Sequence, residues 1–342
     1  MNEAVNQNNY EDSRTFCGDI NYSPVREVVG VNYVIPQIKN DVDFILEETI
    51  LEILLKDRTM NRNVIWGTND YSLLGSMYSA DSEIMISSIT GYNDDVIQSR
   101  VMKEQSKQNQ RTRNNAEVFT PSWICNEQCN LIDNQWFGRK NVFNTQLNKA
   151  WRANPKKIDF PDIKRKTWKD YIDGRRMEIT CGEAPYLASR YDAVSGEAIA
   201  LNERIGFLDR KLRVVNENTD NFDDWYKWIE RAYQSIYGYE YQGDSLLIAR
   251  KNLLFTFIDN MRYKFNRVPT ESELKKIATI ISWNIWQMDG LTNTVPFSDE
   301  RDFKEQLSFF EEDNKERTFC KIKDWRAKKI VEFASLLEGK NG

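Results

Sequence analysis

The pattern of apolar and polar positions separates a polar N-terminal part from a later part built of short apolar segments. Residues 1–40 are rich in Asn and Asp with scattered aromatic residues, which predicts an irregular N-terminal arm. Residues 43–56 carry an apolar stripe on one face and glutamates on the other, which is typical of an amphipathic core helix. We therefore expect residues 41–115 to form a mostly helical N-terminal region.

A second helical stretch, residues 94–114, is polar and carries a basic strip. The strip consists of Arg100, Lys103, Lys107, Arg111 and Arg113 among Gln and Asn residues. On one helix, spaced basic side chains can follow the phosphate backbone of DNA or meet an acidic partner. Charge runs of this size are also common on solvated helix faces, so both interpretations stay open.

Further along the chain, short strands alternate with helices. Residues 176–180, 235–241 and 284–288 are predicted strands, rich in aromatic and β-branched residues. Between the second and third, apolar residues recur at helical spacing, and a capping box at residues 270–273 predicts a further helix over 271–282. This alternation predicts an α/β fold with an open, largely parallel sheet. A charged helix over residues 299–315 and strand-like runs at 320–325 and 330–333 follow.

Composition excludes several classes of protein. With 342 residues, 40% of them hydrophobic, the chain can bury a large core. It contains no histidine, which excludes Ser-His-Asp triads, Cys-His pairs and His-ligated metal sites. The net charge of −5 argues against a protein that coats nucleic acid by itself. No apolar run approaches the roughly 18–20 residues of a membrane span, and no signal peptide is recognisable, so we expect a cytoplasmic protein.

The cysteines predict neither disulfides nor a metal site. They are Cys17, Cys125, Cys129, Cys181 and Cys320, an odd number at irregular spacing. Cys125 and Cys129 share one face of a predicted helix, but no second pair accompanies them. We expect both to be buried as small apolar side chains rather than to act as thiolate ligands.

Four short segments occupy positions where such sheets bind ligands. Residues 117–121 read Glu-Val-Phe-Thr-Pro, 178–183 read Glu-Ile-Thr-Cys-Gly-Glu, 237–240 read Tyr-Gly-Tyr-Glu, and 284–289 read Asn-Ile-Trp-Gln-Met-Asp. The last three segments include the carboxyl ends of predicted strands, beyond which ligands bind in open α/β sheets. Each segment alone also fits an ordinary strand end, a tight turn or, for Thr-Pro, a helix start.

Together and in this order, the segments resemble the amino-methylating, adenine-specific DNA methyltransferases of bacterial restriction-modification systems, in a type IIG-like subgroup. The resemblance covers roughly residues 40–342. It implies that residues 116–342 form the S-adenosyl-L-methionine-binding part of a methyltransferase domain, with the first three strands of a Rossmann-like sheet. The cofactor contacts that it implies are Thr120, Pro121, Glu178, Cys181, Gly182, Glu183, Glu240, Tyr241 and Asp289. Among these, Glu183 would hold the ammonium group, Glu240 the ribose hydroxyls, Tyr241 the adenine face and Asp289 the adenine amine.

The sequence departs from the family pattern in two places. Ala184 and Pro185 stand where a second glycine is usual, and no Pro-Pro pair occurs, so the catalytic Asn/Asp-Pro-Pro-Tyr tetrapeptide is missing. In the family this tetrapeptide holds the flipped adenine at the end of a fourth strand, which pairs beside the first. The resemblance therefore implies no catalytic residue here. It implies a subunit, inactive alone, of a heterodimer in which a partner supplies catalysis and target recognition and which binds double-stranded DNA for methylation.

Two other interpretations stay open, and a third is not expected. The altered loop at Ala184 and Pro185 favours a degenerate methyltransferase fold that acts as an interaction or regulatory protein. A subunit of an RNA or protein methyltransferase is a second alternative, because the cofactor half says little about the substrate. Residues 273–275 fit the Glu-x-Lys of metal-dependent nucleases, but they lie in the capped helix without an upstream Asp partner, so we do not expect nuclease activity.

Overall fold

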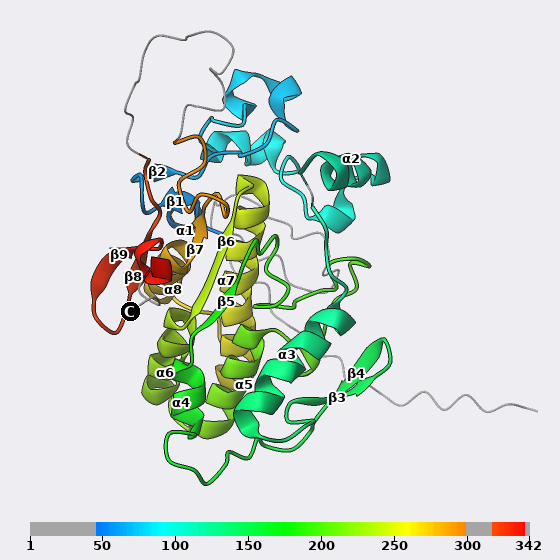
Figure 1. Cartoon of the computed structure of the whole chain (residues 1–342), viewed down its shortest axis with the longest axis vertical. Helices are drawn as coiled ribbons and strands as arrows, with labels where there is room; N and C mark the ends of the chain where they lie inside the picture. Colours follow the sequence, from blue (N-terminus) through cyan, green and yellow to red (C-terminus); the bar gives the residue numbers. More distant parts are fainter. Residues whose placement is uncertain (1–45, 116, 299–316, 339–342) are drawn as a thin grey trace, which may run out of the picture.

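The computed structural model describes residues 46–115, 117–298 and 317–338, which form a mixed α/β fold (Figure 1). The predicted N-terminal arm and the charged helix predicted over 299–315 lie outside the described residues. No helix in these described ranges is long and apolar enough to span a bilayer.

The central sheet has three parallel strands in the order β5-β6-β7. They are β5 (Arg176–Glu178), β6 (Ile236–Glu240) and β7 (Ile285–Gln287), each within two residues of a predicted strand. The connections between them contain helices, as parallel pairing requires. The α/β prediction and its parallel sheet are therefore confirmed.

Helices cover one face of this sheet. α7 (Gly243–Phe265) and α8 (Glu271–Asn284) pack on β6 and β7, with α6 (Phe222–Gln234) beside them and α5 (Phe207–Asn218) against α6 and α7. The predicted capping box starts α8, where Thr270 accepts a hydrogen bond from the Glu273 N–H and Glu273 returns one. α1 (Glu48–Leu55) packs on α7 and α8 and contributes Ile50, Leu51, Leu54 and Leu55 to the main core.

The opposite face is covered only in part. An antiparallel hairpin, β8 (Lys321–Asp324) and β9 (Lys329–Glu332), confirms the two strand-like runs, and its region packs on Tyr237, Tyr239 and Trp286. Over β5 the cover is missing, since Met177 is 45% and Ile179 61% exposed. In the described part of the chain no strand pairs with the outer edge of β5, so the sheet is open there.

The N-terminal region is less helical than predicted. After α1 come a two-stranded ladder, β1 (Lys56–Asp57) and β2 (Arg62–Asn63), and five 3₁₀ turns: η1 (Ser72–Leu74), η2 (Ser76–Tyr78), η3 (Ile86–Ser88), η4 (Gly91–Asn93) and η5 (Arg100–Met102). The helix predicted over 94–114 begins only at Gln105, as α2 (Gln105–Asn115). Lys103 is extended, and its ammonium pairs with Asp244, so a distant contact overrides the local helix propensity.

The remaining elements lie around the helical layer, except α10, which packs on β9. They are α3 (Ser122–Phe137), the hairpin of β3 (Asn144–Leu147) and β4 (Ala150–Ala153), α4 (Trp168–Asp173), η6 (Leu201–Glu203) and α10 (Ser335–Glu338). Cys125 and Cys129 lie on α3 and are fully buried, which confirms their predicted role as small apolar side chains.

Candidate functional site

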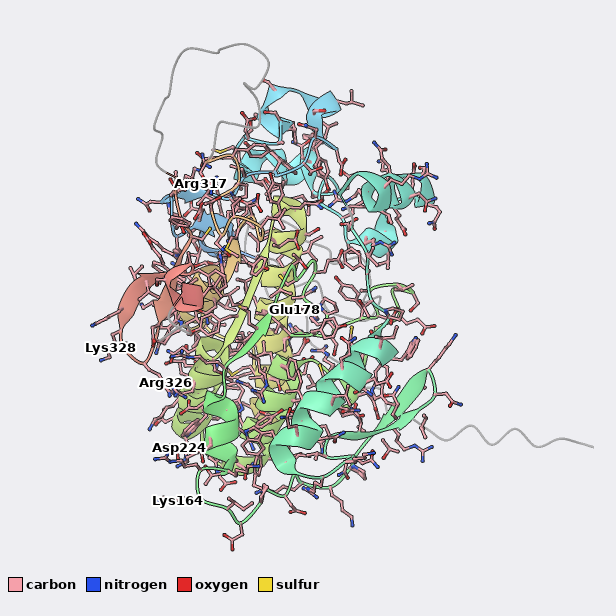
Figure 2. All side chains as sticks on the ribbon, in the orientation of Figure 1. Lys164, Glu178, Asp224, Arg317, Arg326 and Lys328 are labelled. Carbon is pink, nitrogen blue, oxygen red and sulfur yellow. The ribbon has the colours of Figure 1, made fainter. Side chains whose placement is uncertain are left out.

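An open cavity of about 660 Å³ lies beyond the carboxyl ends of β5 and β6. Its walls are residues 117–120, residues 178–182 with Pro185 and Tyr186, and residues 240–242 with Ser245, and Gly67 lies at one side. Its volume lies within the roughly 300–1,000 Å³ of small-molecule sites, and open α/β sheets bind ligands at this position. In Figure 2, Glu178 lies near the middle of the molecule, whereas Lys164 and Asp224 lie at the lower end of the helical layer.

The structure brings six of the nine cofactor contacts that the resemblance implies to this cavity. Those six are Thr120, Glu178, Cys181, Gly182, Glu240 and Tyr241. They come from three segments that are more than 50 residues apart in sequence. Pro121, Glu183 and Asp289 are not among the lining residues.

Glu183 points away from the cavity and does not fit the predicted role of an ammonium ligand. It is 3% exposed and accepts hydrogen bonds from the Arg100 N–H at 2.6 Å and the Tyr191 hydroxyl at 2.5 Å. These contacts fasten η5 to the loop after β5. The physical reason is that Glu183 finds two donors on the protein side of its loop.

Asp289 also lies outside the cavity. Its side chain accepts from the Leu291 N–H at 2.8 Å, within its own turn. Two residues earlier, the side chain of Gln287 donates to the carbonyls of Ile65 and Tyr241 and accepts from the Ile65 N–H. Residues 65–67 therefore pack at the carboxyl end of β7, and Asp289 does not join the residues that line the cavity.

Two buried carboxylates, Glu178 and Glu240, dominate the chemistry of the cavity. Glu240 accepts from the N–H groups of Gly182, Tyr241 and Gln242 at 2.8, 2.9 and 3.1 Å. Glu178 accepts a long hydrogen bond, 3.4 Å, from the Tyr186 N–H, and the Leu187 N–H also interacts with its carboxyl, while its buried Oε2 has no hydrogen-bond partner among the described residues. Burial raises the pKa of both carboxyls, and the charge of Glu240 raises the pKa of Glu178 further.

Two carboxylates line this cavity, so it favours a ligand that offers a cation or an N–H or O–H donor.

The loop below these carboxylates has an unusual backbone. Thr180, Gly182 and Ala184 all adopt left-handed conformations, with φ of 44°, 52° and 63°. Glycine adopts this conformation at no steric cost, whereas Thr and Ala do so under strain. Ala184 thus takes the conformation that a glycine would favour at the position where the family usually has one. Backbone strain of this kind is concentrated at functional sites.

Residues 117–120 form the outer wall. The ring of Phe119 lies 3.5 Å from the position that a Cβ of Gly182 would occupy, and the Arg100 guanidinium lies 5.1 Å from the centre of that ring. Pro121 is the N-cap of α3, one residue later than a helix start at Thr120 predicts. The segment therefore serves both as a helix start and as a cavity wall.

Sequence reasoning missed several lining residues, of which Gly67, Gln242 and Ser245 are the most distinct. Gly67 has φ of 66°, and a Cβ there would lie 2.6 Å from the Tyr241 carbonyl, so only glycine permits this approach. Its position directly after a short apolar run, residues 64–66, carried no usable signal. Gln242 and Ser245 immediately follow the Glu240 segment and could have been found by extending it.

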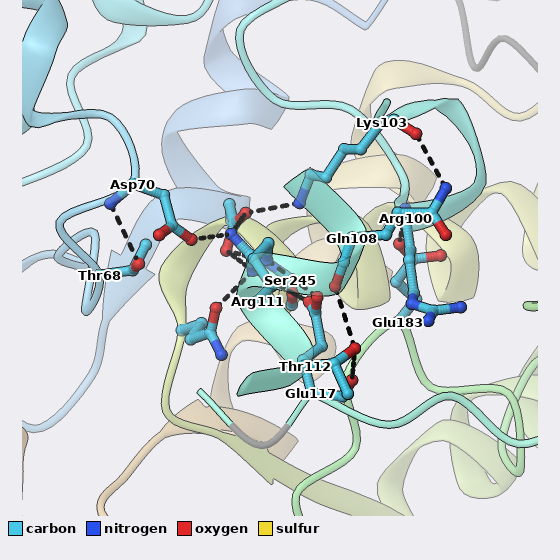
Figure 3. A network of polar contacts seen from close by, with 12 residues as sticks. Thr68, Asp70, Arg100, Lys103, Gln108, Arg111, Thr112, Glu117, Glu183 and Ser245 are labelled. Carbon is cyan, nitrogen blue, oxygen red and sulfur yellow. Dashed lines mark hydrogen bonds and ion pairs between the residues drawn. The ribbon is translucent and has the colours of Figure 1, made fainter. Parts of the chain in front are cut away.

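The predicted basic strip does not exist as one exposed face. Lys103 and Arg111 turn inward, to Asp244 and to a cluster around Glu117, as Figure 3 shows. Arg100 is half-buried over Phe119, and only Lys107 and Arg113 of the five are exposed side chains of α2. The reason is that Asp70, Glu117 and Asp244 form an acidic surface against which this segment packs.

A second open cavity, of about 600 Å³, lies between α1 and residues 85–87. Glu48, Lys56 and Arg58 are among its lining residues, and no end of a parallel strand opens into it. It lacks the converging loops of the first cavity, which is therefore the better candidate site.

No family model, no curated protein and no solved structure matches this chain. The geometry of the cavity and the motifs around it therefore carry the functional assignment.

Proposed function

We propose that the cavity binds S-adenosyl-L-methionine and that the chain is the cofactor-binding subunit of a split, adenine-specific DNA methyltransferase. The observation that carries the proposal is the pair of buried carboxylates, Glu178 and Glu240, at the ends of adjacent parallel strands. This cofactor offers an ammonium, a sulfonium and two ribose hydroxyls, which are the cations and donors that such a cavity favours. We also propose that the protein is cytoplasmic.

Within this proposal the two carboxylates have different roles. Glu178, which lines the cavity, lies near a cationic group of the cofactor, since a nearby positive charge stabilises the ionised form of the carboxyl. Glu240 accepts from ribose hydroxyls with the lone pairs that its three backbone contacts leave available. Tyr241 lies along the adenine, and Thr120 closes the methionine end. Glu183 and Asp289 have no cofactor role.

The open edge of β5 supports the proposal that a partner completes the sheet. Parallel strands are normally buried on both faces, and an unpaired edge is a template for another strand. A partner strand parallel to β5, with apolar groups over Met177 and Ile179, would finish a Rossmann-like sheet. The carboxyl end of that strand would lie beside the cavity, where catalytic residues could aim a flipped adenine of double-stranded DNA at the methyl group.

The cofactor test compares two substitutions in one loop. Glu178→Gln removes the carboxylate that faces the cavity, and Glu183→Gln makes the same change in a side chain that turns away from it. Isothermal titration calorimetry should show S-adenosyl-L-methionine binding to the unsubstituted chain, about tenfold weaker binding to Glu178→Gln, and little change for Glu183→Gln. Equal losses in both variants would contradict the assigned role of Glu178.

The partner test uses co-purification with the product of the adjacent gene, followed by methylation of duplex DNA. Met177→Lys should abolish the complex and its activity, because it places a charge on the uncovered face of β5 and, unlike Ile179, Met177 does not line the cavity. Ile330→Lys is the matched control, since Ile330 is similarly exposed but lies on β9. A subunit that methylates DNA unaided would refute the split enzyme.

A degenerate fold with an interaction or regulatory role is the second candidate, and the position of Asp289 outside the cavity favours it. If the chain binds no S-adenosyl-L-methionine, either alone or with its partner, only the interaction or regulatory role remains.

A further inference from the structure

Arg111 differs from every other described side chain of α2. The helix contains no apolar residue, and its described side chains, residues 105–113, are exposed or half-buried except for Arg111, which is 2% exposed. A polar helix of this length is marginal by itself, because isolated short helices gain little from propensity alone. The burial of Arg111 is therefore a main anchor of α2 on the body of the protein.

The guanidinium of Arg111 joins separate parts of the chain. Its Nε and Nη2 donate to the two oxygens of Glu117 at 2.9 and 3.0 Å, a bidentate pair. Its Nη1 lies 2.9 Å from Asp70 and 3.0 Å from Asp244. Its Nη2 also donates to the side-chain oxygen of Gln242 and lies 3.5 Å from the Ser245 hydroxyl. Figure 3 shows Arg111 at the centre of this network.

Three of these partners, Glu117, Gln242 and Ser245, line the cavity. Arg111 itself is not a lining residue, so it lies behind the wall that they form. Arg111 is also connected indirectly to Glu240, one of the two cavity carboxylates, because the backbone N–H of Gln242 donates to Glu240. One side chain thus connects the outer wall of the cavity to the start of α7.

The charged groups around Arg111 stabilise its buried position. Lys103 pairs with Asp244 at 3.1 Å, and the Tyr71 hydroxyl donates to the same carboxylate at 2.6 Å. Burial alone would raise the pKa of Asp244, but Lys103 and Arg111 hold it well below its usual range. Loss of Arg111 would leave more buried negative charge than Lys103 can balance.

We propose that Arg111 is a positioning residue of the cavity, which holds residues 117–120 against the start of α7 and thereby sets the positions of Glu117, Gln242 and Ser245. Lysine cannot replace it, because one ammonium has no planar fork with which to bridge Glu117, Asp70 and Gln242 together. A test of this proposal by S-adenosyl-L-methionine affinity rests on the proposed function, whereas a test by hydrogen exchange of the backbone amides does not.

The test combines hydrogen exchange with ligand affinity in three matched variants. Arg111→Lys should speed exchange of the α2 amides about tenfold and weaken S-adenosyl-L-methionine binding about tenfold, measured well below its unfolding midpoint. Arg113→Lys, an exposed position on the same helix, should change neither. Arg210→Lys, another buried arginine that lies outside the cavity, should lower the midpoint but leave affinity within about twofold.

Two outcomes would overturn the proposal. One is a folded Arg111→Lys variant with unchanged exchange and affinity, and the other is an equal loss of affinity in Arg210→Lys. If Arg111→Lys does not fold, Glu117→Gln replaces it. Arg111 then keeps Asp70 and Asp244 but loses its bidentate pair with Glu117, so the amides of residues 117–120 should exchange faster, and unchanged exchange there refutes the role. If the unsubstituted chain binds no S-adenosyl-L-methionine, the proposed function fails, and exchange alone decides the role of Arg111.

Discussion

Arg111 and Arg210 are both buried arginines, yet their surroundings differ in a way that separates ligand binding from stability. Arg210 donates to the Ile205 carbonyl, Asp133 and Asn126 at 2.9, 2.7 and 2.9 Å, and Asp133 and Asn126 are almost fully buried. Arg111 instead spreads its contacts over groups that line the cavity. Near it, Glu178 keeps an unpartnered oxygen, and Thr180 keeps a strained backbone.

The comparison indicates that the contacts of Arg210 serve stability, whereas Arg111 connects groups that line the cavity. Natural proteins tolerate local conflicts such as the strained backbone of Thr180 mainly at functional sites. Substitutions in the two regions should therefore separate stability from affinity.

The largest expected effect is that of Arg210→Met. It leaves the Asp133 charge buried without its partner, which should lower the free energy of unfolding by about 3–5 kcal/mol in urea denaturation. Affinity for S-adenosyl-L-methionine, measured on the folded fraction, should not change. The double variant with Asp133→Leu should recover most of the lost stability. A loss below about 1 kcal/mol would show that the pair is not a stabilising element.

The next effect tests a residue of the cavity loop that behaves like the stable region. Glu183→Ala leaves the Arg100 N–H and the Tyr191 hydroxyl without an acceptor, so it should lower the free energy of unfolding by about 2 kcal/mol. Because Glu183 lies outside the cavity, calorimetry should give an unchanged affinity for S-adenosyl-L-methionine. A large loss of affinity would instead support the prediction that Glu183 contacts the ammonium group of the cofactor.

Local signals predicted the sheet and its helices well. The strands around Tyr237 and Trp286 and the capping box at Thr270 depend on neighbouring residues, and all appear near their predicted positions. The resemblance indicated Glu178 and the strand ends indicated Glu240 and Asp289; Glu178 and Glu240 line one cavity, whereas Asp289 does not.

Long-range contacts explain what could not be predicted. Lys103 and Arg111 turn inward because Asp244, more than 130 residues later, attracts both. Asp289 lies outside the cavity because Ile65 binds Gln287 from a segment 222 residues earlier. No periodicity or motif in the sequence records such pairings.

Substitution of Glu178 is expected to have a smaller effect on the free energy of unfolding and to raise it rather than lower it. Burial raises the pKa of this carboxyl above its ordinary value of 4.5, so its protonated form is favoured in the folded state. The associated stability is present below pH 4.5 and is lost as the pH rises through the raised pKa. Glu178→Gln should therefore stabilise the unliganded chain by about 1 kcal/mol at pH 7.5 and have little effect near pH 4.

Thermal unfolding at the two pH values measures this difference. A destabilised Glu178→Gln chain at pH 7.5 would mean that Glu178 is already satisfied without a ligand.

The smallest effect concerns the strained loop. Thr180 is β-branched and exposed at φ of 44°, a conformation that costs an L-residue roughly 1–2 kcal/mol and that glycine adopts freely. Glycine also increases the entropy of the unfolded chain, which offsets part of the gain. Thr180→Gly should therefore raise the free energy of unfolding by about 0.5 kcal/mol, while the looser loop weakens ligand binding slightly. Thr145→Gly, at an exposed position in β3, is the control and should be destabilising. If both substitutions destabilise the chain equally, Thr180 stores no strain, and the contrast between the two regions would rest on Glu178 alone.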